Sequence, residues 1–344
     1  MEKGLISVIV PAFNSEKYIE RALNSVINQN YSNWEMIVID DGSTDNTKKI
    51  CNDLAAEDTR FVIISQENAG PSAARNRGLV HARGEFVAFL DADDWYEPNF
   101  FGKMLHELIQ SDSDIAMCDF DVNGKSEFSY DGRVLEGNEI LRAFAHGSIC
   151  NRIMNKIYRI EVVKDVNFPE GRDLMEDGVW TPHVLEKSKK ITIISEALYH
   201  YYVSEGSVSR RRHRCEREVV GYYKNLLERD RCVLSYLGDT AEKSILQKVL
   251  TDLETVLISC CNLDYWDTKE TAKNLVIDYY SSLQRVSTQE QQILLDSVMN
   301  AGEDEIDKKY HRKLIVSPSI ELKKKVKLLK LYILANYRRV ARGK

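Results

Sequence analysis

Short apolar runs alternate with amphipathic segments along the first 90 residues of the chain. Four runs are rich in β-branched and aromatic residues and predict β-strands, at Ile6–Val10, Trp34–Ile39, Phe61–Ser65 and Phe86–Leu90. Between these strands, apolar residues recur at every third or fourth position and predict helices, at Ile19–Ile27, Thr47–Ala56 and Ser72–Ala82. This alternation is typical of a Rossmann-like α/β fold, in which helices cover both faces of a mostly parallel sheet.

Polar residues follow three of these strands at their carboxyl ends. Asn14 comes after the first strand, Asp41 after the second, and the acidic run Asp91–Asp94 after the fourth. We expect a binding site at this edge, because open α/β sheets bind their ligands there. The loop after the first strand, Pro11–Lys17, contains no glycine. Its sequence therefore argues against the glycine-rich phosphate loops of dinucleotide-binding proteins and P-loop NTPases.

The run Asp91-Ala92-Asp93-Asp94 offers a different way to bind a nucleotide diphosphate. Its carboxylates suit a hard divalent cation, Mn²⁺ or Mg²⁺, which keeps coordination positions open for phosphate oxygens. The alternative is a polar turn that only caps a helix starting near Pro98. The place of the run, directly after a predicted buried strand, favours the metal site.

Composition and charge narrow the class of protein. The 344 residues carry a net charge of −6, and 43% of them are hydrophobic, which allows one large domain or two ordinary ones. Residues 1–120 hold 20 acidic side chains against 10 basic ones, which argues against nucleic-acid binding by this half. No apolar run approaches the length of a membrane span. The seven cysteines are scattered without a CxxC spacing, so we expect a reducing, cytoplasmic setting and neither a zinc knuckle nor a disulfide framework.

Long helical patterns dominate from about Cys215 onward, at Glu216–Leu237, Thr240–Cys261, Lys269–Val286 and Gln289–Met299. We expect two domains: a catalytic α/β domain over residues 1–214 and an α-helical domain over residues 215–344, which either mediates self-association or braces the first. The last stretch, Lys323–Lys344, has nine Lys/Arg and no acid, mixed with apolar residues. It is either a basic amphipathic helix on an anionic membrane surface or a solvated terminal helix.

Four motifs carry a resemblance to a known family. They are Val8–Asn14 (VIVPAFN), Ile37–Asp45 (IVIDDGSTD), Asn68–Gly78 (NAGPSAARNRG) and Gly84–Trp95 (GEFVAFLDADDW). In this order and spacing they resemble the family 2 glycosyltransferases, which have the nucleotide-binding GT-A fold. A looser match continues through Phe168–Arg172 to Glu176-Asp177, so the resemblance covers roughly residues 5–205.

The resemblance implies roles for particular residues. Those matching the nucleotide-binding positions are Pro11, Ala12, Phe13, Asn14, Asp40, Asp41, Arg75 and Asp93. Those matching the metal carboxylates are Asp91, Asp93 and Asp94. Asp177 matches the general base, with Glu176 adjacent to it. Each residue also has a plainer explanation; Asp177, for example, is a good N-cap for a helix over Gly178–Lys187.

The resemblance further implies an inverting, metal-dependent transfer of a hexosyl or N-acetylhexosaminyl group from a nucleotide sugar, expected to be UDP-linked. The acceptor would be a glycan, a lipid-linked glycan or a glycoprotein in the assembly of a bacterial surface polysaccharide. The enzyme would then work in the cytoplasm or at the inner face of the membrane. Two alternatives stay open: a metal-dependent phosphohydrolase with Asp91 as nucleophile, and an inactive glycosyltransferase-like binding protein.

Two segments near the predicted base are candidates for a lid or an acceptor site. The basic segment Arg210–Arg214 contains Arg211 and His213 and would either close over the donor diphosphate or form a solvated hinge. Trp180 and His183 follow Asp177 at helical spacing, and with Glu176 they are placed to line an acceptor site.

Overall fold

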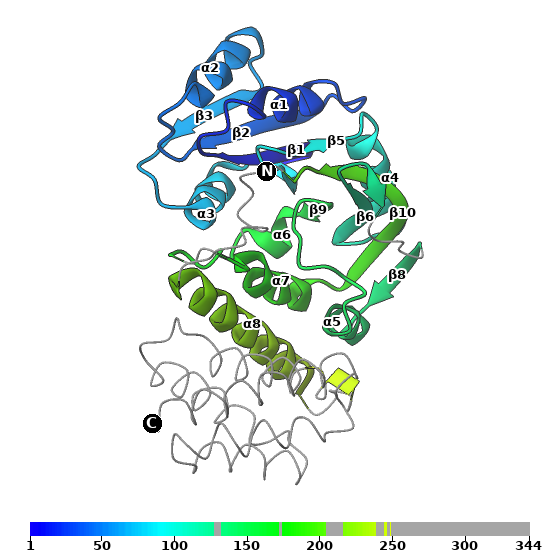
Figure 1. Cartoon of the computed structure of the whole chain (residues 1–344). Helices are drawn as coiled ribbons and strands as arrows, with labels where there is room; N and C mark the ends of the chain where they lie inside the picture. The colour runs from blue at the N-terminus through cyan, green and yellow to red at the C-terminus, as the bar shows by residue number, and fades with distance from the viewer. Residues whose placement is uncertain (127–131, 172–173, 204–215, 239–243, 246–247, 249–344) are drawn as a thin grey trace, which may run out of the picture. The chain divides into compact units, whose positions relative to one another are not determined.

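The computed structural model describes residues 1–126, 132–171, 174–203, 216–238, 244–245 and 248 (Figure 1). The chain divides into two compact units, Met1–Thr240 and Ala241–Lys344. Apart from Ser244, Ile245 and Lys248, the predicted helices from Thr240 onward and the basic tail lie outside the described residues, so the division at residue 214 stays a prediction. Within the described residues, no helix has the length and apolar character needed to cross a membrane.

The first unit builds one mixed sheet and its covering helices. The strands are β1 (Glu2–Ala12), β2 (Trp34–Asp40), β3 (Phe61–Ser65), β4 (Gly84–Phe89), β5 (Trp95–Tyr96), β6 (Ile115–Val122), β7 (Lys125–Ser126), β8 (Arg133–Glu136), β9 (Lys156–Arg159) and β10 (Lys190–Tyr201). The helices are α1 (Ile19–Ile27), α2 (Thr47–Glu57), α3 (Pro71–His81), α4 (Phe100–Gln110), α5 (Asn138–Ala145), α6 (Ile160–Val163), α7 (Glu176–Lys187) and α8 (Glu216–Leu237).

The strands run in the order β3-β2-β1-β4-β9-β6-β10-β5, with β7 on β6 and β8 on β10. The pairs β3–β2, β2–β1, β1–β4 and β6–β10 are parallel. The strand β9 lies antiparallel between β4 and β6. The expected α/β fold is therefore confirmed, and every strand and helix predicted before residue 90 is present with bounds that shift by a few residues at most.

The central parallel strands β1, β2 and β4 are largely buried on both faces, as their continuous apolar runs require, whereas the edge strand β3 is half-buried. Alternate residues of β2 point to opposite sides. Met36 and Val38 pack into the large core that also contains residues of α1, whereas Ile37 and Ile39 pack with Ala74 of α3. Figure 1 shows α1 and α3 on opposite sides of these strands. Because β1, β2 and β4 run parallel, their carboxyl ends lie at the same edge of the sheet.

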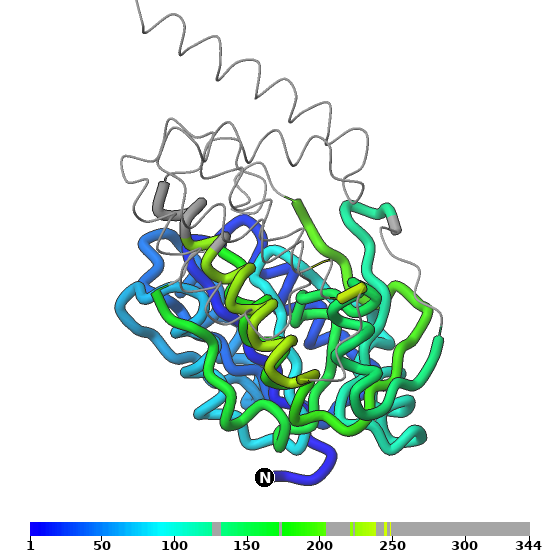
Figure 2. The backbone as a smooth tube through the Cα atoms, turned by 90° about the horizontal axis from the view of Figure 1, so that it is seen from below, coloured from blue at the N-terminus to red at the C-terminus, as the bar shows by residue number. Residues whose placement is uncertain are grey.

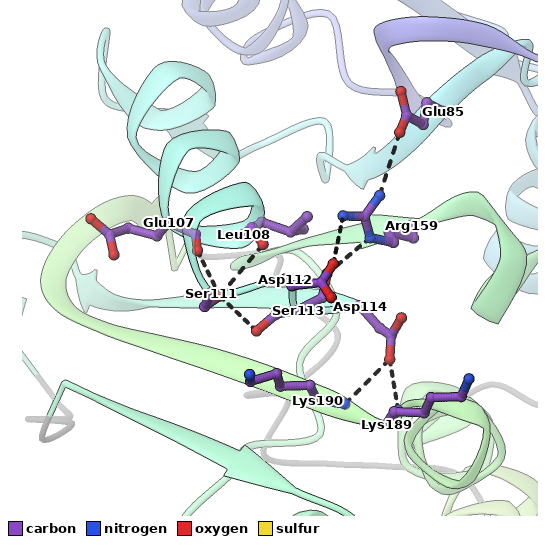
Figure 3. Close-up of polar contacts among 10 residues, drawn as sticks. All are labelled: Glu85, Glu107, Leu108, Ser111, Asp112, Ser113, Asp114, Arg159, Lys189 and Lys190. Atoms are coloured by element: carbon purple, nitrogen blue, oxygen red, sulfur yellow. Dashed lines mark hydrogen bonds and ion pairs between the residues drawn. The ribbon is translucent and has the colours of Figure 1, made fainter.

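The second half of the sheet is joined to the first by polar contacts at the start of β6 and β10 (Figure 3). The Arg159 guanidinium, at the end of β9, donates to the carbonyl of Ser113 at 3.0 Å and pairs with Glu85 of β4 at 3.4 Å. The Asp114 carboxylate accepts from the backbone N–H of Lys190 at 3.2 Å. These contacts connect the ends of β4, β6, β9 and β10 at this edge of the sheet.

Helix α8 packs against α7 in the first unit. The His183 ring of α7 contacts the Tyr236 hydroxyl and the Cys232 thiol of α8. The Asn225 amide of α8 donates to the carbonyl of Leu174, just before α7, at 2.5 Å. Figure 2 shows α8 crossing the molecule in the view from below. The contacts of His183 explain its position: it faces α8, and this packing lowers its pKa mainly through burial.

We predict that Gly78→Ala destabilises the protein by about 1–3 kcal/mol, the usual cost of overpacking. A Cβ at this position of α3 would lie 2.4 Å from Cγ2 of Ile9, so β1 and α3 would have to separate. Urea unfolding checks the value. The control is Val80→Ala on the same helix, where the side chain is 82% exposed and the expected change is within about 0.5 kcal/mol. Equal stability of the two variants would contradict the close packing.

Candidate functional site

The acidic run after β4 divides into three side chains with different surroundings. The Asp91 carboxylate accepts from the Arg75 guanidinium at 3.0 Å. Asp94 is fully buried; one oxygen accepts from the Tyr199 hydroxyl and the other from the backbone N–H of Tyr202 at 2.8 Å. Both carboxylate oxygens of Asp94 thus accept hydrogen bonds from the protein. The expected contact of Asp94 with a metal stays a prediction, and it would require at least one of these hydrogen bonds to break.

Asp93 lies between these two acids and is half-buried. Burial and the negative charge of Asp91 raise the pKa of Asp93 to about 6, and the positive charge of Arg21 opposes this shift. Arg21 itself stacks over Trp95, 3.9 Å from the ring centroid, and donates to the backbone carbonyl of Asp93. An acid whose ionised form is disfavoured by an acidic neighbour is one that a bound cation would stabilise.

A divalent cation fits this run if the protein supplies some of its ligands and the substrate supplies the others. No cluster of three or more His, Cys, Asp or Glu side chains that could hold a metal is found among the described residues. Mg²⁺ is commonly held by one or two carboxylates together with phosphate oxygens and water. Asp93, with Asp91 beside it, meets this requirement, whereas a complete protein cage is absent from the part of the chain that the structure describes.

Arg75 of α3 joins the acidic run to the start of α7. Its guanidinium pairs with Asp91 at 3.0 Å and with Glu176 at 2.8 Å, and it lies 5.5 Å from the centroid of the Phe168 ring. Burial alone would lower the pKa of Arg75, but the two carboxylates raise it above its usual value. The side chain is 8% exposed, and its two ion pairs place a permanent positive charge between two acidic segments.

Asp177 follows Glu176 in the first turn of α7. The helix is preceded by Met175, whose φ of 62° is left-handed, so Asp177 is inside the helix and not its N-cap. One Asp177 oxygen accepts from the backbone N–H of Gly178 at 2.7 Å. Burial and the charge of Glu176 raise the pKa of Asp177 to about 7, and Arg75 and Arg152 oppose the shift. Asp177 is therefore suited to exchange a proton near neutral pH.

The residues expected at the nucleoside lie where β1 and β2 end. The Asp41 carboxylate accepts from the Gln66 amide at 2.7 Å and from the backbone N–H groups of Ala69 and Gly70 at 2.9 and 2.8 Å. It thus shapes the loop that leads into α3. Asn14 adopts a left-handed φ of 46° and accepts from the backbone N–H of Thr44 at 2.9 Å.

The other expected nucleoside residues surround these two. Asp40 is buried and accepts from the backbone N–H of Ser43 at 3.2 Å. Pro11 and Ala12 end β1 in register with β2, and Phe13 follows with 48% of its surface exposed. The structure therefore brings the first-strand loop and the second-strand acids together at one edge, while their nucleotide contacts stay a prediction.

The remaining expected residues are placed differently. Trp180 has no exposed surface; its indole N–H donates to the carbonyl of Val166 at 2.8 Å, and its ring stacks on Phe168 with centroids 4.4 Å apart. In this structure Trp180 positions α7 from inside the core instead of presenting a face to an acceptor. Arg211 and His213 lie outside the described residues.

Several residues beside the site were not anticipated from the sequence. They are Arg21, Arg152, Tyr199 and Tyr202. The available signal was the aromatic run Tyr199-His200-Tyr201-Tyr202, since four consecutive large polar-tipped rings at the end of a strand require partners for their polar atoms.

With this geometry established, comparison with known proteins identifies the family. The family model described as "Glycosyl transferase family 2" matches residues 7–165. A glycosyltransferase of Haemophilus influenzae, named as uncharacterized, is 33% identical over 180 residues, which are 49% of this chain and 68% of that protein. The chain belongs to glycosyltransferase family 2, and it is a glycosyltransferase.

A second relative is much longer. The glycosyltransferase GlyA of Streptococcus pneumoniae is 33% identical over 219 residues, 60% of this chain, but the matched part spans only 31% of GlyA. Among solved structures, Staphylococcus aureus TarS 1–349 in complex with UDP-GlcNAc superimposes with a TM-score of 0.67 at 22% identity, covering 88% of each chain. This likeness shows that the fold is the GT-A fold.

We predict that Arg75→Met destabilises the protein by about 3–5 kcal/mol at neutral pH, because it leaves Asp91 and Glu176 as uncompensated, largely buried charges. Chemical unfolding provides the measurement. The matched control is Arg77→Met on the same helix, where the side chain is exposed. A loss for Arg75→Met no larger than that of the control would show that the ion-pair bridge does not hold the two segments.

Proposed function

We propose that this glycosyltransferase moves a hexosyl or N-acetylhexosaminyl group from a UDP-sugar to an acceptor hydroxyl with inversion at the anomeric carbon. The observation that carries the proposal is the Arg75 bridge, which joins the Asp91–Asp94 run to the helix turn bearing Asp177. Binding of UDP-GlcNAc by the similarly folded TarS supports the donor class. The acceptor we propose is a glycan, a lipid-linked glycan or a glycoprotein in surface polysaccharide assembly.

In the proposed reaction, the Asp177 carboxylate takes the proton of the acceptor hydroxyl while that oxygen attacks the anomeric carbon. The bond between the anomeric carbon and the diphosphate oxygen breaks, and UDP leaves with the electron pair. A single displacement of this kind inverts the configuration through an oxocarbenium-like transition state. A positioned base typically contributes a rate factor of about 10²–10⁴.

The surroundings of Asp177 suit this role. Its pKa of about 7 means that a substantial ionised fraction exists at neutral pH and that the carboxylate is more basic than a solvated one. The Arg75 guanidinium supplies a fixed positive charge between this base and the acidic run. Asp93 and Asp91 would hold a divalent cation, whose charge would stabilise the departing diphosphate.

A phosphohydrolase is the poorer explanation of this site. That reaction would require the Asp91 carboxylate as a free nucleophile, but its oxygen is bound by the Arg75 guanidinium, which makes it less nucleophilic. The binding-protein alternative is also less well supported, because the raised pKa of Asp177 is typical of an acid that exchanges protons.

Three further expectations stay predictions. The closing segment with Arg211 and His213, the basic tail at a membrane and self-association through the helical region all involve residues outside those that the structure describes. Working at the inner face of the membrane would bring the enzyme to a lipid-linked acceptor.

The donor and the metal are tested together by measuring UDP release from a panel of UDP-hexoses and UDP-N-acetylhexosamines, with GDP- and TDP-sugars for comparison. We expect release from at least one UDP-sugar with Mn²⁺ or Mg²⁺ and loss of release after chelation, because the cation offsets charge on the leaving group. Free inorganic phosphate as the product would favour hydrolysis of a phosphate bond. If no sugar nucleotide in the panel releases its nucleoside diphosphate, the proposed function is refuted.

We predict that Asp177→Asn lowers kcat about 10²–10⁴-fold and that wild-type kcat rises with pH to a plateau, with a midpoint near pH 7 set by the raised pKa of Asp177. The native state holds this proton more tightly than the unfolded chain does, so ionisation costs stability as the pH rises from about 4 to about 7. Asp177→Asn should therefore be at least as stable as wild type at pH 8.

The control for this prediction is Asp53→Asn on α2, where the acid forms an exposed pair with Lys49. It should keep wild-type kcat and the wild-type pH profile. An Asp177→Asn enzyme that turns over at the wild-type rate would exclude Asp177 as the base.

A further inference from the structure

The segment before β9 is held in one conformation by a buried lysine. The Lys156 ammonium, 1% exposed, donates to the carbonyls of Cys150 and Arg152 and to the Asn155 side-chain oxygen at 2.9 Å. The Asn155 amide donates in turn to the carbonyl of Cys118 in β6 at 2.5 Å. These hydrogen bonds connect residues 150–155 to one another and to β6 of the sheet.

This loop places the Arg152 guanidinium over two aromatic rings. The guanidinium carbon lies 4.3 Å from the centroid of the Tyr201 ring and 5.0 Å from that of Phe120. Arg152 also forms a hydrogen bond with the Tyr201 side chain. Stacking of this kind orients the planar guanidinium but leaves most of its five N–H donors without an acceptor.

Among the described residues, no carboxylate lies within ion-pair distance of Arg152, although the side chain is half-buried. Arg75 and Arg159 differ in this respect, because Arg75 pairs with two acids and Arg159 pairs with Glu85. A half-buried guanidinium that is oriented by aromatic rings and lacks an acidic partner is well suited to bind an anion in a forked geometry.

The loop that carries Arg152 is connected to α7, the helix that bears Asp177. The neighbouring Asn151 carbonyl accepts from the Thr181 hydroxyl of α7 at 3.0 Å, which connects the loop to the helix that carries Asp177. The charge of Arg152 acts on Asp177, whereas the charged groups acting on Asp93 are Asp91 and Arg21. Arg152 is thus connected with the proposed base both through the Asn151–Thr181 hydrogen bond and through its charge.

From this placement we infer that Arg152 binds an anionic group, a phosphate or a carboxylate, carried by the acceptor near the hydroxyl that reacts. The inference rests on the proposed function, because it takes Asp177 as the base that the acceptor approaches. Arg152 is a specificity-determining residue in this view: it favours charged acceptors over neutral ones of the same size. Because the loop and the rings already orient the guanidinium, little conformational entropy is lost on binding.

The experiment uses the full chain saturated with UDP and Mg²⁺, so that the diphosphate position is filled. Two matched pairs of probes, glycerol 3-phosphate against glycerol and glucuronate against glucose, are titrated and followed by ligand-observed NMR. The first pair tests for a phosphate and the second for a carboxylate. The variants are Arg152→Gln and Arg152→Lys, with Arg133→Gln on the exposed strand β8 as a control of equal charge change.

We expect wild type to bind at least one anion more tightly than its neutral partner, and Arg152→Gln to lose about tenfold in affinity for that anion, the scale of a charge-assisted hydrogen bond. Arg152→Lys should retain part of the preference, because it keeps the charge without the fork, and Arg133→Gln should retain all of it. Should Arg152→Gln fail to fold, Arg152→Lys alone still reports the loss of the fork.

Two outcomes would overturn the inference: wild type without any preference for an anion, or Arg152→Gln with the wild-type preference. A change only in the pH profile of UDP release, with anion binding intact, would assign Arg152 to the tuning of Asp177 and would equally overturn it. Because anion binding is measured without turnover, its failure is distinct from failure of the proposed function, which shows as absence of UDP release from every donor.

Discussion

A single buried cation, Arg75, determines how the two parts of the site meet. It connects α3, the loop after β4 and the first turn of α7, and its partners Asp91 and Glu176 are 16 and 101 residues away along the chain. One positive charge between two carboxylates leaves this region negative. Burial is the main cause of the raised pKa values of the two nearby acids outside the bridge, Asp93 and Asp177, and the charges of Asp91 and Glu176 add to it. Burial beside other carboxylates thus favours a cation at one end of the bridge and a proton at the other.

The sequence predicted the parallel half of the sheet well, because each element there follows one rule. Strands buried on both faces appear as continuous apolar runs, and the apolar positions that predicted α1 include all four of its buried residues, Ile19, Ala22, Leu23 and Val26. The acidic run was placed correctly at the end of β4 for the same reason. The loops after β1 and β2 could be placed together because parallel strands end at one edge.

Helix α7 shows where sequence patterns stop being informative. Its residues Gly178–Pro182 are all buried, so polar and apolar positions do not alternate in the way that reveals an inner face. Trp180 thus seemed available to an acceptor, although it stacks on Phe168 inside the core. The start of the helix was equally hidden, because it depends on the left-handed backbone of Met175 and not on a capping side chain. Both features are set by long-range packing, which a local pattern does not contain.

The end of β10 connects the two sides of the site through the simple alternation of a strand. Tyr199 and Tyr201 lie two residues apart on one face: the first bonds Asp94 beside the proposed metal site, and the second orients Arg152 beside Asp177. Between them, His200 points to the opposite face, where it stacks on Trp95 and contacts Asp121. A shift of one residue in the pairing of β10 with β6 would exchange these faces and would remove both tyrosines from the site at once. The register of one strand therefore ties the geometry around Asp94, on the proposed donor side, to that around Arg152, on the proposed acceptor side.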